Sequence, residues 1–148
     1  MADSKQAGAG RKFSGHCHCG AVRFEVELPT ELRGSRCNCS ICTRTAVTSA
    51  IVKPEAFELR EGAAQLGAYA WGARISTRYF CKECGVHCYG KGFLEAVGGD
   101  YVAVNLNCVE GIDVGELEVM HWDGRNDNWQ AGPRNSPWPV RTPPDIVA

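Results

Sequence analysis

The sequence predicts a mainly β, single-domain fold with little helix, and three observations support this prediction. The chain has 148 residues, which is about the length of one domain with a single core. Residues 21–28 alternate strictly, with apolar side chains at the even positions and Arg or Glu at 23, 25 and 27, as expected of a half-buried strand. No window of about twelve residues shows the apolar stripe of an amphipathic helix.

Six further short strands are expected after this one. Each is rich in β-branched or aromatic residues, and they cover residues 47–52, 56–60, 74–80, 86–89, 101–106 and 117–122. Residues 65–71 and 108–114 could each form a turn or two of helix. There is no internal repeat and no domain linker, so the predicted architecture is one series of short strands.

The composition changes from Asp123 onward to Gly, Asn, Pro and Trp, which favours turns and extended segments. We expect this stretch to wrap the domain, with Trp122, Trp129 and Trp138 burying their rings against its body. The alternative interpretation is that these rings form an aromatic wall for a substrate. We expect a flexible N-terminus at residues 1–12, the domain at 13–140 and a C-terminal tail at 141–148.

Charge and composition exclude some classes of function. Lys and Arg total 16 against 17 Asp and Glu, and no basic run could neutralise a phosphate backbone, so no nucleic acid partner is expected. Residues 1–12 lack the apolar stretch of a secretion signal or a membrane span. We therefore expect a cytoplasmic protein with no membrane partner. In that reducing compartment, an odd total of nine cysteines favours metal binding or catalysis over disulfides.

Two pairs of cysteines have the spacing of metal half-sites. Cys17 and Cys19 are two residues apart, and in an extended segment such side chains project from the same face, close enough to share a zinc ion. Cys81 and Cys84 are followed by Gly85, whose free backbone lets the chain double back so that both sulfurs face one point. Together the pairs supply a closed set of four ligands, which would tie the first strand to the middle of the chain and contribute directly to folding.

A third cluster gathers Cys37, Cys39 and Cys42 and has no obvious fourth protein ligand. Because a catalytic zinc keeps one position open, this trio resembles an open site that could bind the thiolate of a substrate. The alternative is a second structural site completed by one of four other residues: His16, His18, His87 or Cys88. Cys88 and Cys108 are interpreted as small buried residues or spare thiols. We expect two zinc ions per chain, with the second more easily lost on purification.

Four motifs follow one another in the order Gly15-His16-Cys17-His18-Cys19-Gly20, Cys37-Asn38-Cys39-Ser40-Ile41-Cys42, Arg78-Tyr79-Phe80-Cys81-Lys82-Glu83-Cys84-Gly85 and Val104-Asn105-Leu106. This set resembles the glutathione-dependent formaldehyde-activating enzyme (GFA) family over residues 13–140. The resemblance implies a zinc-binding β-tent fold of short antiparallel strands. It also implies a structural zinc on Cys17, Cys19, Cys81 and Cys84 and a catalytic zinc on Cys37, Cys39 and Cys42, which agrees with the ligand count above.

The resemblance further implies an activity, the addition of the glutathione thiol to formaldehyde to give S-(hydroxymethyl)glutathione, which is classed as a carbon-sulfur lyase reaction. We therefore expect a zinc-dependent enzyme that adds a thiol such as glutathione to a small aldehyde, or catalyses the reverse. Arginines would hold the carboxylates of the thiol. Arg44 and Arg36 flank the trio and are the first candidates, followed by Arg74 and Arg78. Two alternatives stay open, a non-catalytic zinc module that serves as a platform for another protein and a labile site for metal storage or sensing.

Overall fold

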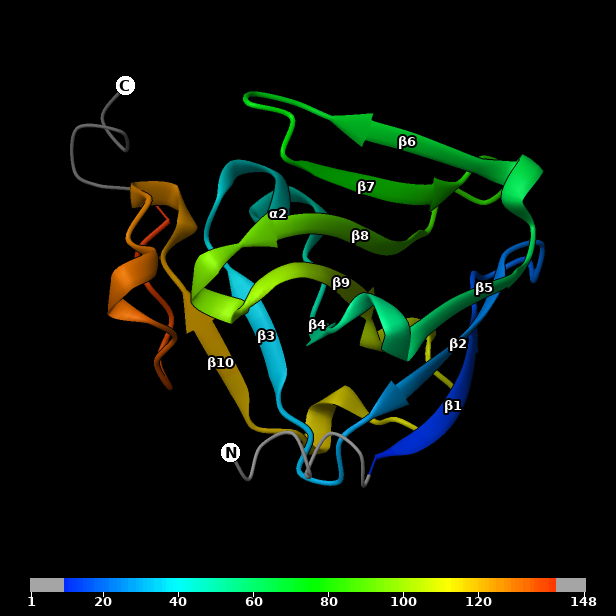
Figure 1. The fold of residues 1–148 in the computed structure, drawn as a ribbon, viewed down its shortest axis with the longest axis horizontal. Coiled ribbons are helices and arrows are strands. Elements are labelled where there is room, and N and C mark those ends of the chain that lie inside the picture. The colour runs from blue at the N-terminus through cyan, green and yellow to red at the C-terminus, as the bar shows by residue number, and fades with distance from the viewer. Residues whose placement is uncertain (1–9, 141–148) are drawn as a thin grey trace.

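The computed structural model describes residues 10–140, which form two β-sheets and one short α-helix (Figure 1). The prediction of a mainly β fold with little helix is confirmed. The strands are β1 (Arg11–His16), β2 (Arg23–Leu28), β3 (Gly34–Cys37), β4 (Ser49–Val52), β5 (Phe57–Glu61), β6 (Leu66–Ala70), β7 (Ser76–Cys81), β8 (His87–Leu94), β9 (Gly99–Asn105) and β10 (Val119–Trp122). Residues 1–9 of the predicted flexible N-terminus and the predicted tail at 141–148 lie outside the described residues.

The helical elements are all short. The α-helix is α2 (Ser40–Thr45), and the 3-10 helices of residues 10–140 are η1 (Pro54–Ala56), η2 (Ala63–Gln65), η3 (Glu95–Val97), η4 (Leu106–Cys108), η5 (Val114–Glu116), η6 (Gly124–Asn126) and η7 (Trp129–Ala131). In this part of the chain, no helix has the length and the apolar composition needed to span a lipid bilayer.

The two sheets differ in size. Strands β1, β2 and β5 form a three-stranded antiparallel sheet. The larger sheet has the order β10-β3-β4-β9-β8-β7-β6, and its neighbouring strands are antiparallel except for β3 and β10, which run parallel. Figure 1 shows this parallel pair on the opposite side of the molecule from the three-stranded sheet. The β3–β10 pairing brings the C-terminal part of the chain beside the Cys37–Cys42 region.

One apolar core joins the two sheets. Phe24, Val26 and Leu28 of β2 are each 1% exposed, so the alternation predicted for this strand is confirmed. Val102 and Val104 of β9 are buried in the same cluster. Because the full burial of one such side chain contributes about 1.5–3 kcal/mol, this shared core holds the sheets together as one domain.

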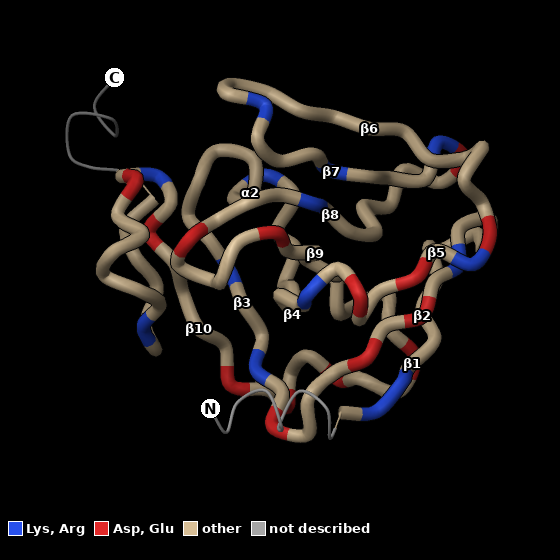
Figure 2. The backbone as a smooth tube through the Cα atoms, in the orientation of Figure 1, with Lys and Arg blue, Asp and Glu red and all other residues tan. Residues whose placement is uncertain are grey.

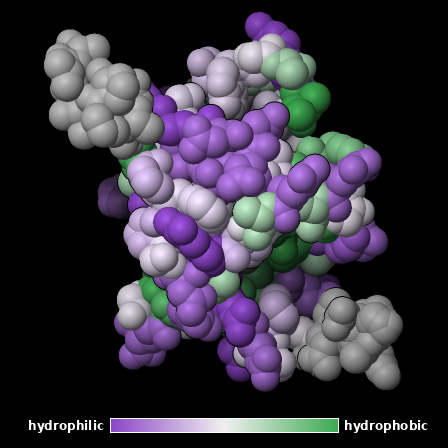
Figure 3. All heavy atoms as spheres, turned by 90° about the vertical axis from the view of Figure 1, so that its left-hand side faces the viewer, coloured by the Kyte–Doolittle hydropathy of each residue, from purple (hydrophilic) through white to green (hydrophobic). Residues whose placement is uncertain are grey.

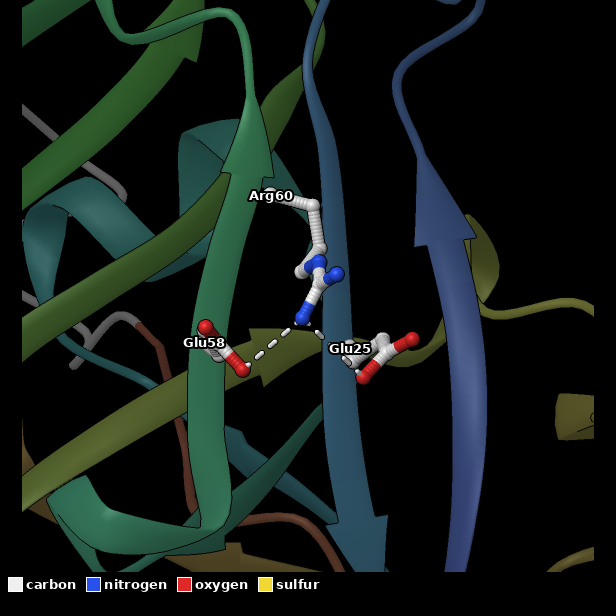
Figure 4. A network of polar contacts seen from close by, with 3 residues as sticks. All are labelled: Glu25, Glu58 and Arg60. Atoms are coloured by element: carbon white, nitrogen blue, oxygen red, sulfur yellow. Dashed lines mark hydrogen bonds and ion pairs between the residues drawn. The ribbon is translucent and has the colours of Figure 1, made fainter.

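The outer face of the three-stranded sheet is charged. On β5, Arg60 donates to the Glu58 carboxylate at 3.1 Å, and it lies 3.8 Å from the carboxylate of Glu25 on β2 (Figure 4). Figure 2 shows residues of both charge signs along β1, β2 and β5. Arg60 and Glu58 are exposed, so this face of the sheet is in contact with solvent. Such exposed ion pairs contribute only about 0–1 kcal/mol each to stability. The face that carries the C-terminal stretch is also largely hydrophilic (Figure 3).

The seven expected strands correspond to β2, β4, β5, β7, β8, β9 and β10. Strands β1, β3 and β6 were not predicted. Strand β6 forms within residues 65–71, where the sequence allows a turn or two of helix, because that segment pairs with β7 at the edge of the larger sheet and sheet pairing overrides a weak local preference. A turn or two of helix was also considered for residues 108–114. There Cys108 ends η4 and Val114 begins η5, and residues 109–113 between them form a loop.

Candidate metal centres

The first candidate metal centre is built from the turns of two hairpins. Cys17 and Cys19 follow β1 in the turn that leads to β2, whereas Cys81 and Cys84 bracket the turn between β7 and β8. The four sulfur atoms all lie within 4.8 Å of one another. The structure thus brings the four expected ligands together, and this quartet links the three-stranded sheet to the seven-stranded sheet.

The turn after β1 explains how Cys17 and Cys19 converge. Gly20 has a φ of 83°, in the left-handed region that glycine adopts easily, and its N–H donates to the Cys17 carbonyl at 3.3 Å. The backbone N–H of Val22 donates to the Cys17 sulfur at 3.4 Å. The expectation that this pair lies in an extended segment is therefore wrong, because the sulfurs meet through a turn that folds the chain back.

The turn after β7 has the conformation that its sequence predicts. Gly85 has a φ of 79° and donates its N–H to the Cys81 carbonyl at 2.7 Å. Burial raises the pKa of Cys84, but hydrogen bonds with the backbone of Cys19 and Val86, together with those to the Cys81 and Cys17 thiols, lower this pKa to about 6. Since the thiolate is the form that binds metal, this turn holds one ligand ready for it.

The spacing of the quartet fits zinc. The Sγ atom of Cys19 lies 3.7 Å from that of Cys17 and 3.7 Å from that of Cys81. Four sulfurs placed tetrahedrally about 2.3 Å from a zinc ion would lie about 3.8 Å apart. The donor set therefore has the chemistry and the spacing of a closed structural site.

The second candidate centre lies where β3 leads into α2. Cys37 ends β3, Cys39 precedes α2 and Cys42 lies within the helix. The three sulfurs lie within 4.8 Å of one another, and within residues 10–140 no His, Cys, Asp or Glu adds a fourth donor to the group. Hydrogen bonds with the Cys37 and Cys42 thiols lower the pKa of Cys39, and hydrogen bonds with the Cys37 and Cys39 thiols raise the pKa of Cys42. The trio therefore offers three sulfur donors around one point.

Two of the alternative fourth ligands have other partners. The Nε2 atom of His16 lies 2.8 Å from the Glu110 carboxylate. Cys88 is fully buried, and its thiol donates to the Val86 carbonyl at 3.5 Å. Cys108 is buried as well, so Cys88 and Cys108 are small buried residues, as predicted. All nine cysteines lie in the described part of the chain and are free thiols.

The trio opens into a cavity of about 290 Å³, and the quartet does not line it. This volume is near the lower end of the range of small-molecule sites, about 300–1,000 Å³. Much of the wall is aromatic, including Trp71, Phe93 and Tyr101, and the permanent charges on it are those of Arg36 and Arg78. No Asp or Glu from residues 10–140 lines the cavity. The cavity therefore combines apolar walls with positive charge beside three thiols.

Arg78 is the arginine that contacts the trio. Its Nη2 donates to the Cys42 sulfur at 3.5 Å, and its guanidinium lies 5.4 Å from the centre of the Trp71 ring. Arg36 also lines the cavity and donates to the Thr48 hydroxyl at 3.3 Å. Neither guanidinium has a carboxylate partner within residues 10–140, so both are available to an anionic ligand.

Arg44 and Arg74 lie away from the cavity lining. Arg44 donates to the Ser40 carbonyl of its own helix at 2.9 Å in an exposed position. Arg74 donates to the Ala70 carbonyl at 3.4 Å, also in an exposed position. Of the four arginines considered from the sequence, the structure thus brings Arg36 and Arg78 to the cavity, together with the trio.

Of the three tryptophans considered from the sequence, two line the cavity and one anchors the C-terminal stretch. Trp122 and Trp129 both line the cavity, with ring centroids 5.9 Å apart, so they form part of an aromatic wall. Trp138 does not line it, and its Nε1 donates to the His121 carbonyl at 2.9 Å, which anchors the stretch to β10.

His87 was considered as a fourth ligand of the trio; it lines the same cavity but is not a fourth donor within the group of three sulfurs. Burial, and after it the positive charge of Arg78, lowers the pKa of His87. The imidazole is therefore neutral at pH values where a free histidine is partly charged. No sequence signal brings His87 to the cavity, because its position depends on how β8 pairs with β7 and β9.

Comparison with known proteins identifies the family. The model of the family described as glutathione-dependent formaldehyde-activating enzyme matches residues 12–122. The chain belongs to this family. The family match contains all seven cysteines of the two centres. It extends from β1 to the end of β10 and so includes both sheets.

Three relatives are described, provisionally, as glutathione-dependent formaldehyde-activating enzymes. A protein of Emericella nidulans is 34% identical over 99 residues, which are 62% of this chain and 50% of that protein. A protein of Halomonas elongata is 59% identical over 34 residues, 23% of this chain and 22% of that protein. One of Penicillium rubens is 32% identical over 80 residues, 51% of this chain and 41% of that protein. The chain thus spans half or less of the curated relatives that it matches.

A solved structure supports the fold. A crystal structure of a Rhodobacter sphaeroides protein, determined in a structural genomics programme, superposes with a TM-score of 0.63 at 31% sequence identity. The superposition covers 72% of this chain and 98% of that one. Most of this chain therefore shares its fold with a separate protein of known structure.

Proposed function

We propose that this chain is a zinc-dependent enzyme of the carbon-sulfur lyase type, which adds a thiol to a small aldehyde or catalyses the reverse. The observation that carries this proposal is the difference between the two centres, since the trio lines the cavity and the quartet does not. The quartet would hold a structural zinc and the trio a catalytic one. The functional unit would be residues 13–140, in the reducing cytoplasm that keeps their thiols free.

The trio would hold its zinc through three sulfurs and leave a position for the substrate. A zinc ion there would supply Lewis acidity that favours the thiolate form of a thiol near neutral pH. Three thiolates and one divalent cation carry a net charge of about −1, which opposes the approach of an anion. Arg78, 3.5 Å from the Cys42 sulfur, offsets this charge. Arg36 adds a second positive charge on the same cavity wall.

His87 is the residue of the cavity best suited to move the proton. In the forward reaction a bond forms between the thiol sulfur and the aldehyde carbon, the carbonyl π bond breaks, and the S–H proton ends on the carbonyl oxygen. A neutral imidazole can accept that proton from the thiol and return it to the oxygen. The lowered pKa of His87 keeps the imidazole in its neutral form at physiological pH, and the apolar cavity walls limit competition from water.

The thiol is proposed to be glutathione or a similar carboxylate-bearing thiol, and the aldehyde to be formaldehyde or another small one. Guanidinium groups hold carboxylates in bidentate fashion, and Arg36 and Arg78 are the two on the cavity wall. Since no acidic residue of the described chain lines the cavity, a thiol with a carboxylate should bind better than one with an ammonium group. 3-Mercaptopropionate and cysteamine are a matched pair for this comparison.

The proposal is tested with cobalt(II) in place of zinc, because the absorption of cobalt-thiolate centres reports a change of ligand. Glutathione and 3-mercaptopropionate are expected to change the spectrum of the wild type but not that of Cys42→Ser. Turnover is followed by mixing thiol and formaldehyde and measuring the hydroxymethyl thioether product. A spectrum that stays constant at millimolar thiol, together with no acceleration of product formation, would refute the enzyme and favour a non-catalytic zinc module.

A further inference from the structure

A buried amide lies between two cysteines of the trio. Asn38 separates Cys37 from Cys39 and is 6% exposed. Its Nδ2 donates to Asp123 at 2.8 Å and to the Pro139 carbonyl at 2.9 Å, and its Oδ1 accepts from the N–H of Arg125 at 2.9 Å. Both donor hydrogens and the carbonyl oxygen are thus engaged, all by partners from the C-terminal stretch.

The carboxylate that receives this amide is itself enclosed. Asp123 is 4% exposed. Besides Asn38, it accepts from the side-chain amide of Asn126 at 3.0 Å on Oδ1 and from that of Asn128 at 3.2 Å on Oδ2. Three amides therefore hold one buried carboxylate, and such charge-assisted hydrogen bonds are about twice as strong as neutral ones. We refer to Asn38, Asp123, Asn126 and Asn128 as the polar clamp.

The backbone on both sides of the clamp also touches the trio. Asn38 donates its N–H to the Trp122 carbonyl at 3.3 Å, and its carbonyl accepts from Nε of Arg125 at 3.0 Å. At Gly124 a Cβ would lie 2.5 Å from the Cys37 sulfur. The chain after β10 therefore passes directly against a proposed metal ligand, at a place where only glycine fits.

We propose that the polar clamp positions Cys37 and Cys39 as metal ligands, so that the C-terminal stretch sets how tightly the trio retains its metal. Asn38 and Asp123 are the central positioning residues, and they are 85 positions apart in the sequence. Groups that orient metal ligands typically change metal affinity about 10–100-fold when they are removed. The inference rests on one part of the proposed function, that the trio binds a metal ion. It does not depend on whether that metal serves catalysis.

The test measures zinc retention at the trio with a chromogenic chelator. The Cys42→Ser variant, which keeps the quartet, gives the baseline for the other site. Asn38→Asp places two carboxylates against each other, and Asp123→Asn places an amide donor against the Asn38 amide donor. Each variant should therefore release trio zinc at a chelator concentration about 10–100-fold lower than the wild type does, whereas the chelator concentration that removes quartet zinc should not change. The double variant Asn38→Asp with Asp123→Asn exchanges the two side chains. It keeps the net charge, restores one hydrogen bond and should recover part of the lost zinc retention.

Gly124→Ala provides a second variant, which removes no hydrogen bond. Its methyl group would press on the Cys37 sulfur and on the Trp129 ring, so it should also loosen trio zinc, in a fold held by the intact quartet. Arg134→Ala is the control in the same stretch, because Arg134 bonds only to the carbonyls of Ser136 and Pro137 and to the Trp138 ring among residues 10–140, beside the β-bridge of its own backbone. Its trio zinc should match that of the wild type.

Two results would overturn the clamp. One is wild-type zinc retention in Asn38→Asp and Gly124→Ala, even if their melting temperatures fall. The other is equal loosening by Arg134→Ala, which would indicate general docking of the stretch. If the wild type retains a single zinc per chain, the proposed function fails, but the clamp can still be tested on metal-free protein. In that test iodoacetamide should alkylate Cys37 faster in Asn38→Asp than in the wild type. Equal alkylation rates, measured by mass spectrometry, would refute the clamp.

Discussion

Replacing Arg78 with methionine removes one positive charge beside the trio and keeps an unbranched side chain. The Arg78 Nη2 to Cys42 Sγ distance is 3.5 Å. Two unit charges at this separation attract by about 1.2 kcal/mol with the dielectric constant of bulk water, and by about 4.7 kcal/mol with an effective value of 20. Since about 1.4 kcal/mol corresponds to a factor of ten, the trio should lose at least about sevenfold in affinity for a divalent metal that needs a thiolate at Cys42.

The assay is a competition between the protein and a chelator for cobalt(II), followed through the cobalt-thiolate absorption. Arg44→Met is the matched control, because Arg44 lies two residues after Cys42 but bonds to the Ser40 carbonyl and does not line the cavity. Binding of 3-mercaptopropionate should weaken in Arg78→Met and stay unchanged in Arg44→Met. Equal effects of the two substitutions, or a larger effect of Arg44→Met, would refute the charge argument.

Three further predictions concern the quartet, the trio and the cavity histidine. Cys81→Ser should cause a large loss of thermal stability, measured by circular dichroism, because it breaks the site that ties the two sheets; a melting temperature close to that of the wild type would contradict this. Cys42→Ser should keep the melting temperature but reduce zinc from two to one per chain by elemental analysis, and unfolding of this variant would show that the trio is structural. Wild-type turnover should fall as pH drops through a His87 pKa that lies below the usual value of about 6.5, because protonation removes the base. His87→Gln should be slower and lack this acid limb, and an unchanged pH profile would exclude His87.

The quartet was accessible to sequence reasoning because its ligands come in short local motifs. The spacing of Cys17 and Cys19, and of Cys81 and Cys84, limits each pair to one hairpin turn, and glycine follows both pairs. The spacing did not predict the local conformation correctly, because Cys17 and Cys19 lie in a turn and not in an extended segment. The strand alternation of residues 21–28 was equally local, and it predicted the buried face of β2 correctly.

The cavity could not be predicted because it depends on contacts between distant segments. Arg36 and Arg44 both flank the trio in the sequence, yet of these two only Arg36 lines the cavity. Arg78 reaches Cys42 from 36 positions away, through β7. His87 and Trp129 join the same cavity from other elements. The link between Asn38 and Asp123 was invisible for the same reason, since it follows from the parallel pairing of β3 with β10.

The separation of the two hairpin turns has a consequence for synthesis of the chain. Cys19 and Cys81, whose sulfurs lie 3.7 Å apart, are 62 positions apart in the sequence. At a translation rate of about 5–20 residues per second, the ribosome needs about 3 to 12 seconds to add the second half of the site. During that interval the nascent N-terminal hairpin carries two unligated thiols, and a chain emerging into an oxidising lumen would be open to mispairing before its partner turn exists.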